Sequence, residues 1–485
     1  MQSVYFFGNG QADGSAEMKD VLGGKGANLH EMTRLGIPVP PGFTISATLC
    51  ATYLQAQALS DEVRSEITTA IAQLESATGR AFGGAEAPLL VSIRSGAPVS
   101  MPGMMDTILN LGLNDTTVEA LAAQSGNPAF AYDSYRRFVQ MYGEVVFGLK
   151  ANGANPVEHA IEDLKRRRGV DRVIDLDSAD LKDLVHTIKR IIHDETGKAF
   201  PDDPWDQLRG AVEAVFLSWN TRRAIKYRRA HRIGDAVGTA VNVVAMVYGN
   251  MGEDSGTGVV FTRNPSTGEP TLFGEFLVNA QGEDVVAGIR TPEPISAMHK
   301  FWPGIEGRLR ELGRTLERHF RDMQDIEFTV ERGELYLLQT RAAKRTARAA
   351  VRVAVDMVAE ALLSQQDAVK RVDAHQLDQL LHPTIDTDAK LDVMATGLPA
   401  SPGAAVGQVV FDADVAAERG AKGDHVILVR RETNPDDFHG MVAAVAILTE
   451  RGGIRRRNKQ PALLIFDEFR NCPYASRNDR PSTKH

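Results

Sequence analysis

Two acids, an amide and a guanidinium occur at two-residue spacings in "RDMQDIEFTVERGELYLLQTR", residues 321–341. Asp325 and Glu327 precede the central "ERG", and Gln339 and Arg341 follow it. Carboxylate and amide oxygens are hard ligands suited to Mg²⁺, which completes its coordination with water and substrate phosphates. A guanidinium can clamp a phosphate through its planar fork. The set predicts a magnesium-phosphate site, and the alternative is a solvated hairpin face with a surface ion pair.

Two strands must position these residues. Side chains alternate along a strand, so Ile326, Phe328 and Val330 share one face while Asp325 and Glu327 share the other. We expect the first face to be core.

The loop between the strands decides which residues of the second strand join each face. A two-residue loop would pair Glu331 with Glu334 and set two like charges opposite each other. A three-residue loop ending on Gly333 would pair Val330 with Glu334. We expect the longer loop because it separates an apolar face from a polar one.

A second candidate segment is "LGGKGANLHEMTRLGIPVPPGF", residues 22–43. Gly23, Gly24 and Gly26 would let the backbone approach a ligand, and Lys25 would supply a charge. A helix starting near Ala27 would aim its N–H groups at an anion. The Walker spacing is absent. The alternative is an ordinary turn with an exposed lysine.

The stretch "VSIRSGAPVSMPGMMDTILNLG", residues 91–112, has a similar composition. A strand delivers Arg94, and a flexible loop through Gly103 follows it. Methionines suit a surface that repacks, so a closing lid near residues 100–107 is one interpretation. Methionines packed in the core are the other.

The segment "NVVAMVYGN", residues 242–250, is an apolar strand. Its backbone beside Met246 and Val247 could offer an adenine hydrogen bonds and an apolar slot. Buried sheet core is the alternative.

Lys25, Arg94 and Arg341 come from three separate segments. If their roles were purely structural, each charged residue would need its own explanation. Phosphoryl transfer explains them together, because it depends on positioning and on neutralising oxygen charge with Mg²⁺, lysine and arginine.

The composition of the chain argues against several classes of protein. The chain has 485 residues and a formal net charge of −8, which argues against a nucleic-acid or acidic-membrane binder. It lacks a long apolar run and a signal-like start, so we expect a cytoplasmic protein. Cys50 and Cys472 cannot form a disulfide framework or a CxxC metal site.

The fold class that we expect is α/β (α+β). Residues 1–110 mix short strands with helices such as 61–77, which follows Ser60 as a cap and stops near Gly79. The pattern is helical from 115 to 235, and strands return afterwards. Residues 344–381 form amphipathic helices, and a small β-rich module follows.

Several motifs resemble the pyruvate phosphate dikinase family. They are "GGKGANLHEM", "VPPGFTIS", "SIRSGAPVSMPGMMDTILNLGLND", "FAYDSYRRF", "GNMGEDSGTGVVFTRNPSTGE", "GEFLVNAQGEDVVAGIRTP", "RDMQDIEFT", "LQTRAAKRTA", "LDQLLHP" and "ATGLPASPGAA". The motif "SMPGMMDTILNLG" resembles this family more than the phosphoenolpyruvate synthases and antibiotic phosphotransferases.

The resemblance implies an ATP-grasp-like nucleotide-binding region with a helical insertion, a helical linker and a truncated, swivelling phosphohistidine-type domain. The implied boundaries are 1–114 and 236–343 for the two ATP-grasp subdomains, 115–235 for the helical subdomain, 344–383 for the linker, 384–453 for the partial domain and 454–485 for a divergent basic tail.

The resemblance also implies roles for individual residues. Lys25, Arg94 and Arg341 would bind ATP phosphates, Glu327 and Gln339 would hold Mg²⁺, and Asp325 would assist. Further candidates lie in matching motifs: Arg137, Glu275 and Glu283.

The sequence departs from the family at its phosphohistidine motif, Gly-Gly-x-Thr-Ser-His. Gly452 and Gly453 match, but Arg457 stands where the histidine is expected. A guanidinium stays protonated and offers no nucleophilic lone pair, so we expect no catalytic residue there. The tail resembles nothing in the family and the pyruvate barrel has no counterpart, which suggests a truncated or frameshifted gene. The alternative is a genuine ending that binds a partner.

Three functions are consistent with these observations. The first is an ATP- and Mg²⁺-binding part of a dikinase that converts ATP, phosphate and pyruvate into AMP, diphosphate and phosphoenolpyruvate, without turnover alone. In the second, a separate chain supplies the phosphohistidine and the barrel. The third is a nucleotide-binding regulator or scaffold. The family resemblance is also compatible with a homodimer.

Overall fold

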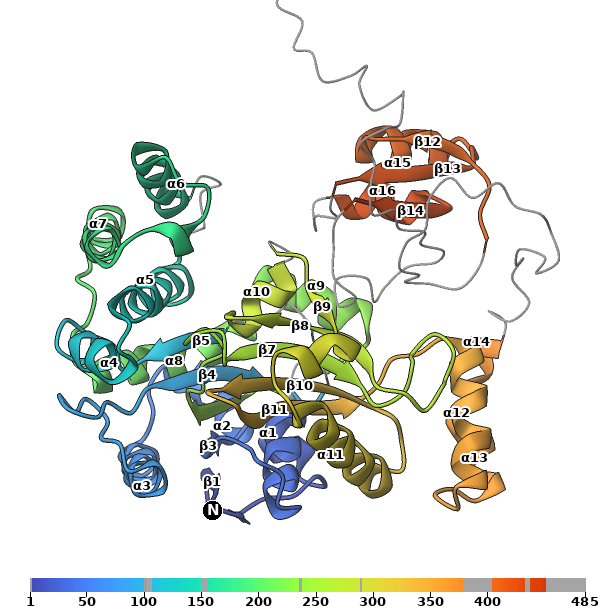
Figure 1. Ribbon diagram of the computed structural model, residues 1–485, viewed down its shortest axis with the longest axis horizontal. Helices are drawn as coiled ribbons and strands as arrows, with labels where there is room; N and C mark the ends of the chain where they lie inside the picture. The colour runs from blue at the N-terminus through green and yellow to red at the C-terminus, as the bar shows by residue number, and fades with distance from the viewer. Residues whose placement is uncertain are drawn as a thin grey trace, which may run out of the picture. The chain divides into compact units, whose positions relative to one another are not determined.

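The computed structural model of the chain describes residues 2–99, 101, 107–149, 155–234, 238–287, 290–377, 404–431 and 437–450. It is a mixed α/β structure with two compact units. One holds Met1–Ser255 and Phe328–Thr340, and the other holds Gly256–Glu327 and the residues from Arg341 onward. The expected α/β (α+β) class is therefore confirmed at this level (Figure 1).

The first sheet lies in the first unit and has the strand order β2-β1-β3-β6-β4-β5. Its strands are β1 (Val4–Gly8), β2 (Gln11–Ala12), β3 (Gly42–Ile45), β4 (Val91–Gly96), β5 (Thr107–Leu111) and β6 (Ala240–Ala245). All neighbouring pairs are antiparallel. Strands β3 and β6 are buried along their whole length and are mostly apolar, and their two polar residues, Thr44 and Asn242, are hydrogen-bonded to each other.

Helices cover and extend this sheet. They are α1 (Lys19–Arg34), α2 (Thr48–Ala56), α3 (Asp61–Thr78), α4 (Thr117–Ser125), α5 (Pro128–Val145), α6 (Pro156–Arg168), α7 (Ser178–Thr196), α8 (Pro204–Ser218) and α9 (Arg222–Ala230), with a 3-10 turn η1 (Val173–Asp175). The described residues between 115 and 234 contain helices and no strand, as the sequence predicts. The helix expected at 61–77 is α3, with the Ser60 side chain accepting from the Val63 N–H and Gly79 in the left-handed conformation.

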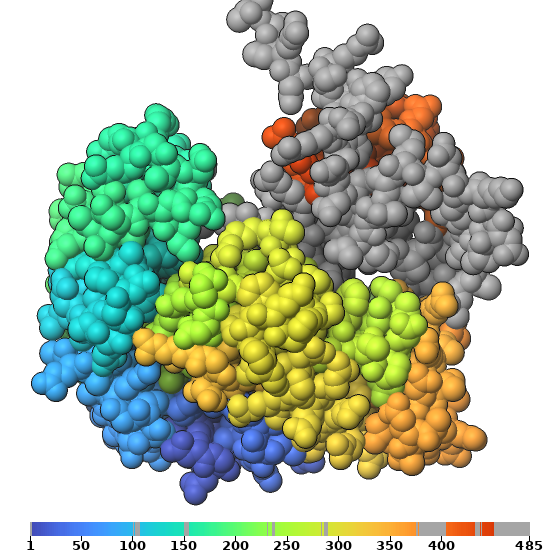
Figure 2. All heavy atoms as spheres, viewed as in Figure 1, coloured from blue at the N-terminus to red at the C-terminus, as the bar shows by residue number. Residues whose placement is uncertain are grey.

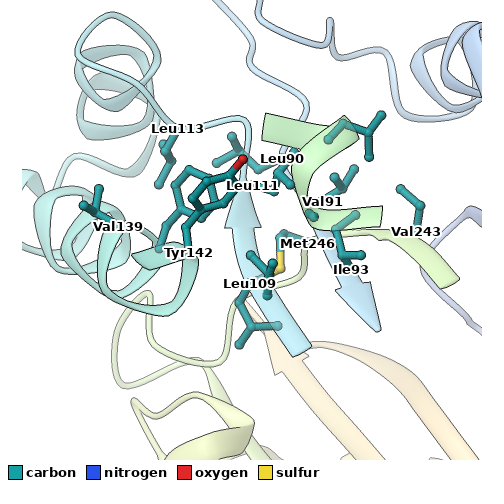
Figure 3. Close-up of a cluster of buried hydrophobic side chains, with 14 of the residues drawn as sticks. Leu90, Val91, Ile93, Leu109, Leu111, Leu113, Val139, Tyr142, Val243 and Met246 are labelled. Atoms are coloured by element: carbon teal, nitrogen blue, oxygen red, sulfur yellow. The ribbon is translucent and has the colours of Figure 1, made fainter. Parts of the chain in front are cut away.

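The core of the first unit lies between this sheet and its helices. Leu111 of β5 lies next to Tyr142 of α5, and Ile93 of β4 lies beside Met246 (Figure 3). These residues and Leu109 and Val139 belong to one cluster and are at most 9% exposed. Burying such side chains is worth roughly 1.5–3 kcal/mol each. The core therefore holds β4 and β5 firmly.

The second sheet has the strand order β11-β10-β7-β8-β9. Its elements and neighbours are β7 (Gly256–Phe261), β8 (Phe273–Val278), α10 (Gly282–Ala287), β9 (Glu293–Pro294), η3 (Ile295–Lys300), α11 (Ile305–Phe320), β10 (Gln324–Glu331) and β11 (Glu334–Ala342). The expected strands around residues 242, 258 and 273 and the two hairpin strands are thus present.

The later helices are α12 (Ala347–Ala359), α13 (Gln365–Arg371) and α14 (Ala374–Leu377). They fall in the segment 344–381, where amphipathic helices are expected, and residues 378–381 lie outside the described residues.

The segment after residue 404 differs from the β-rich expectation. It forms β12 (Gln408–Val410), α15 (Ala413–Ala421), β13 (Val426–Arg430), α16 (Phe438–Ala443) and β14 (Ala446–Thr449). The strands are parallel in the order β12-β13-β14, and parallel neighbours need a crossover connection such as a helix. Their core contains Val410, Ala416, Val426, Leu428, Ala444 and Ile447.

In the part of the chain that the structure describes, no helix is both long and apolar enough to cross a membrane.

Candidate functional site

Helix α1 carries Lys25 and is interrupted at one residue. Gly23 has φ 66° and ψ 166°, outside the helical region, so a regular helix resumes after it rather than near Ala27 as expected. The N–H of Gly24 donates to the carbonyl of Ala97 at 3.0 Å. This N–H is therefore used by the protein, and the prediction that N–H groups at the start of this helix face an anion stays a prediction for the others.

The glycines before and after Lys25 allow close packing of backbone on strands. A Cβ built on Gly23 would lie 1.7 Å from the carbonyl oxygen of Gly96. One on Gly26 would lie 2.7 Å from Oδ1 of Asn242. These two positions exclude a side chain because of neighbouring protein, whereas the sequence interpretation assigned them to ligand approach.

This packing brings Lys25 close to the strand that carries Arg94. Lys25 follows Gly24, which is bonded to Ala97, and Arg94 lies in β4 only three residues before Ala97. Both side chains are half-buried. Within the first unit, two of the predicted phosphate-binding cations therefore come from adjoining segments.

A buried hydrogen-bond chain runs beneath these cations. The Gly14 N–H donates to Nδ1 of His30 at 3.1 Å, which places the ring proton on Nε2. Nε2 then donates to Oγ1 of Thr44 at 3.3 Å, and this hydroxyl donates to Oδ1 of Asn242 at 2.8 Å. Nδ2 of Asn242 donates to the carbonyl of Arg94 at 3.3 Å. The chain ties α1, β3 and β6 to the backbone of the Arg94 residue.

Burial lowers the pKa of His30 to about 3, since no solvent stabilises its charged form. A neutral ring is also what the hydrogen bonds require, because Nδ1 must accept. Sequence reasoning missed His30, although it sits in the quoted motif five residues after Lys25.

Helix α1 is also bonded to β11. Nδ2 of Asn28, three residues after Lys25, donates to the carbonyl of Thr340 at 2.7 Å. The N–H of Leu337 donates to the carbonyl of Pro38 at 2.8 Å. Thr340 stands between Gln339 and Arg341, so the helix with Lys25 is anchored at the strand that carries two predicted site residues.

The hairpin loop is shorter than expected. Strand β10 ends at Glu331 and β11 begins at Glu334, and the two residues between them, Arg332 and Gly333, have φ of 49° and 80°. Two residues with positive φ are typical of a type I′ turn, which matches the twist of antiparallel strands. The expectation of a three-residue "ERG" loop pairing Val330 with Glu334 is wrong.

The like charges that argued against this loop do not oppose each other in solvent. The carboxylate of Glu331 accepts from the Tyr248 N–H at 2.5 Å, whereas Glu334 is exposed. Burial raises the pKa of Glu331 above its ordinary value, against the opposing effects of the Tyr248 hydrogen bond and of Arg80 and Arg332. The hydrogen bond from the Tyr248 N–H to the partly buried carboxylate of Glu331 therefore matters more for the loop length than repulsion between Glu331 and Glu334.

The alternation of buried and less buried residues in β11 changes towards the end of the strand. Its buried positions are Leu335, Leu337 and Thr340, so the spacing changes from two residues to three at Leu338 and Gln339. This one-residue shift has the effect of a β-bulge and turns the end of the strand over. On β10, Ile326, Phe328 and Val330 are fully buried, as expected for the core face.

Asp325 and Arg341 form an ion pair. Nε and Nη2 of Arg341 lie 2.8 and 2.7 Å from the same oxygen of Asp325. The aspartate side chain is 3% exposed and the arginine side chain 25% exposed. The buried acid therefore holds the guanidinium of Arg341 in one geometry.

Glu327 and Gln339 are half-buried. Glu327 lies two residues after Asp325 in β10, and Gln339 two residues before Arg341 in β11, so strand alternation directs each toward the side of its neighbour in the ion pair. Carboxylate and amide oxygens are both ligand types that Mg²⁺ accepts, and the assignment of these two residues to a metal stays a prediction. Among the described residues there is no group of three or more His, Cys, Asp or Glu that could hold a metal.

Met246 and Val247 lie at the end of β6. The Met246 side chain is 7% exposed and lies in the core near Ile93 and Leu109 (Figure 3), so the core alternative holds for this side chain. Its N–H donates to the carbonyl of Leu90 at 2.9 Å. Val247 is half-buried.

The other predicted site residues are more dispersed. Arg137 lies on α5, with Nε 2.9 Å from Asp133. Burial would raise the pKa of Asp133, but Arg136 and Arg137 outweigh it and lower that pKa to about 2. Glu275 is buried in β8 opposite Val259 of β7. Gly103 lies outside the described residues.

Two more predicted features fall outside the described part. The side chain of Glu283 on α10 is not described, and Arg457 with the preceding glycines lies beyond residue 450. The predicted lid at 100–107 is described only at its ends.

Comparison with known families gives two matches. Residues 19–77, 57–302 and 306–362 match the family described as pyruvate phosphate dikinase, AMP/ATP-binding domain. Residues 422–455 match the family described as PEP-utilising enzyme, mobile domain.

Curated proteins of the same kind are similar over almost the whole chain. The chain is 53% identical to a pyruvate, phosphate dikinase of Rhizobium meliloti (strain 1021) over 93% of its own length and 51% of that protein. It is 53% identical to one of Clostridium symbiosum, covering 91% and 51%, and to chloroplastic pyruvate, phosphate dikinase 1 of Arabidopsis thaliana, covering 93% and 47%. The chain spans about half the length of these relatives.

Proposed function

Because the chain belongs to the pyruvate phosphate dikinase AMP/ATP-binding domain family, we propose that it binds ATP with Mg²⁺ and serves the nucleotide half-reaction of such a dikinase. The observation that carries the proposal is the buried Asp325–Arg341 ion pair, adjoining the residue at which α1 is bonded to β11. A guanidinium whose geometry is fixed by a buried acid is suited to a polyphosphate.

Each phosphate-binding residue has a distinct part in this proposal. Lys25 and Arg94 bind phosphate oxygens as cations, and Arg341 binds them through the fork that Asp325 orients. Glu327 and Gln339 hold Mg²⁺, which neutralises phosphate charge when it is bound.

The adenine would lie against the end of β6. Val247 follows Met246, whose N–H is bonded to Leu90, and precedes Tyr248, whose N–H is bonded to Glu331. Two anchored neighbours would hold the main chain of Val247 rigidly for an adenine. Met246 contributes apolar surface and backbone.

Four residues are secondary candidates for ATP contacts: Gly103, Arg137, Glu275 and Glu283. The finer fold belongs to the same proposal: ATP-grasp subdomains at 1–114 and 236–343, a helical subdomain at 115–235, a linker at 344–383, part of a phosphohistidine-type domain at 384–453 and a divergent tail at 454–485.

The whole reaction of the relatives, converting ATP, phosphate and pyruvate into AMP, diphosphate and phosphoenolpyruvate, needs a phosphohistidine and a pyruvate site. With Arg457 at the expected histidine position, we propose that this chain does not complete the reaction alone, and in a variant of this proposal a separate chain supplies the phosphohistidine. A cytoplasmic location and a homodimer remain part of the proposal.

Replacing the metal-binding carboxylate tests this function. We expect Glu327→Ala to weaken Mg²⁺-dependent ATP binding by about tenfold or more, because a carboxylate ligand is lost. Glu334→Ala is the matched control, since this acid is exposed beside the turn, and its affinity should be unchanged. Calorimetric titration with Mg·ATP measures both. Equal affinities of the two variants would contradict the proposal.

Glu331 is unsuitable as the control, although it is nearest the loop. Its carboxylate holds the Tyr248 N–H next to Val247, so Glu331→Ala would disturb the proposed adenine position as well as the fold.

A further inference from the structure

The second unit contains a cavity of about 340 Å³ whose lining includes none of the residues proposed to bind ATP or Mg²⁺. It is lined by residues of α11, by Thr262 and Arg263 directly after β7, by Pro270 and Leu272, and by Glu360 and Leu362 after α12. Helix α11 lies at the surface in the face shown in Figure 2, where it is coloured yellow. A cavity of this size suits a small metabolite.

Three arginines of α11 line the cavity: Arg310, Arg314 and Arg318. Residues four apart share one face of a helix, and each step rises about 6 Å, so the guanidinium groups form a single row. Arg310 is paired with Glu306 at 2.7 Å. Arg314 and Arg318 are exposed, and in the described part of the chain no ion pair is recorded for either.

Arg263 engages both acids of the cavity wall and cancels one of their two negative charges, so the wall cannot fully neutralise the charges of Arg314 and Arg318. Its Nε and Nη2 lie 3.0 Å from Glu317, and its Nη1 and Nη2 lie 3.0 and 2.6 Å from Glu360. The Thr262 hydroxyl also donates to Glu317 at 2.5 Å. The Arg263 side chain is 3% exposed, so this triad is a fixed internal group.

Gly313 lets α11 pack closely against Thr262 in the cavity wall. A Cβ built there would lie 3.0 Å from Cγ2 of Thr262, so a side chain would press on the wall. The absence of a side chain between Arg310 and Arg314 leaves the helix backbone as the floor. Leu272 and Leu362 add an apolar side to the charged one.

We propose that this cavity, the α11 cavity, binds a phosphoryl dianion, either free phosphate or the phosphate of a small metabolite. Arginine forks match the geometry of tetrahedral oxyanions, and two of them stand four residues apart with their charge available. The site is distinct from the ATP site proposed above, whose predicted residues do not line the cavity.

The test uses the full chain and inorganic phosphate. Arginines are modified with phenylglyoxal and mapped by mass spectrometry, with and without phosphate. We expect phosphate to slow modification of Arg314 and Arg318 several-fold and to leave Arg308 unaffected, since Arg308 lies on α11 outside the cavity. Equal protection of all three arginines would overturn the proposal.

Substitutions give an independent readout of affinity. In a Lys25→Met background, which removes a proposed ATP-phosphate contact, the double variant Arg314→Gln/Arg318→Gln should weaken phosphate binding by about tenfold or more. Arg308→Gln is the control and should bind normally. Unaltered binding by the double variant would overturn the proposal. Ribose 5-phosphate is titrated in parallel. If it binds more tightly than inorganic phosphate, the ligand of the cavity is an organic phosphate; if it does not, the ligand is free phosphate.

Discussion

At the scale of single residues, His30 is the position where chemistry and folding are most directly linked. It is fully buried, accepts one hydrogen bond and donates another, and its pKa is lowered to about 3. In the unfolded chain this histidine has a pKa near 6.5, so between about pH 6.5 and pH 3 it is protonated in the unfolded chain and neutral in the folded one. The stabilising contribution is therefore complete above pH 6.5 and is lost as the pH falls toward 3.

We expect the free energy of unfolding to fall by about 2 kcal/mol from this residue alone between pH 7.5 and pH 5. Urea denaturation at several pH values measures it. In His30→Gln, which is less stable at pH 7.5, the slope over this range should be smaller by that amount. His159→Gln, an exposed histidine on α6, should keep the wild-type slope. An unchanged slope in His30→Gln would contradict the assignment.

At the scale of elements, the kinked start of α1 determines where Lys25 lies. Gly23 and Gly36 both have positive φ, 66° and 71°, but Gly23 touches the carbonyl of Gly96 while Gly36 has nothing within 4 Å. At Gly23 a side chain is therefore opposed by a backbone conformation that is essentially restricted to glycine and by the close approach of Gly96, whereas at Gly36 only the positive φ opposes it.

Gly36→Ala should cost about 1–2 kcal/mol of stability, the usual penalty for an alanine in the left-handed region. Gly23→Ala should cost at least about 3 kcal/mol, because helix and strand must also move apart. It should weaken ATP binding too, whereas Gly36→Ala should not. Denaturation and ATP titration of both variants measure these effects. Similar losses of stability would mean that the contact with Gly96 is unimportant.

The elements also show what the sequence can and cannot predict. Helix α3 is predictable because its signals are local: Ser60 caps one end and Gly79 the other. The hairpin strands and their core face follow from alternation. The loop was mispredicted because the interaction that decides it is distant, between Glu331 and Tyr248, 83 residues apart. The glycines of α1 were misassigned for a similar reason, since their neighbours Gly96 and Asn242 belong to other strands.

At the scale of the whole molecule, the chain combines a nucleotide-binding family region with a short match to a mobile domain. Among the described histidines of the latter, His439 is half-exposed and its Nε2 lies 2.8 Å from Asp414. This is a hydrogen-bonded pair on the surface, and Arg457 occupies the expected histidine position.

We expect no acid-labile label when the purified chain is incubated with β-³²P-ATP and Mg²⁺, because a guanidinium cannot accept the phosphoryl group. Filter binding before and after acid treatment measures the label. Label that disappears in His439→Gln or His425→Gln would show that another histidine has taken over the role. ATP binding without label, but with an effect on a partner enzyme, would favour the regulator or scaffold alternative.

The change of alternation at Leu338 and Gln339 has a consequence for how this gene can vary. Removing one codon there would shift every later residue by one position, so that the buried residues Thr340 and Ala343 and the ion pair of Arg341 with Asp325 would all be displaced. A substitution at either position changes one side chain. A length change at this point should therefore be tolerated less well than a substitution.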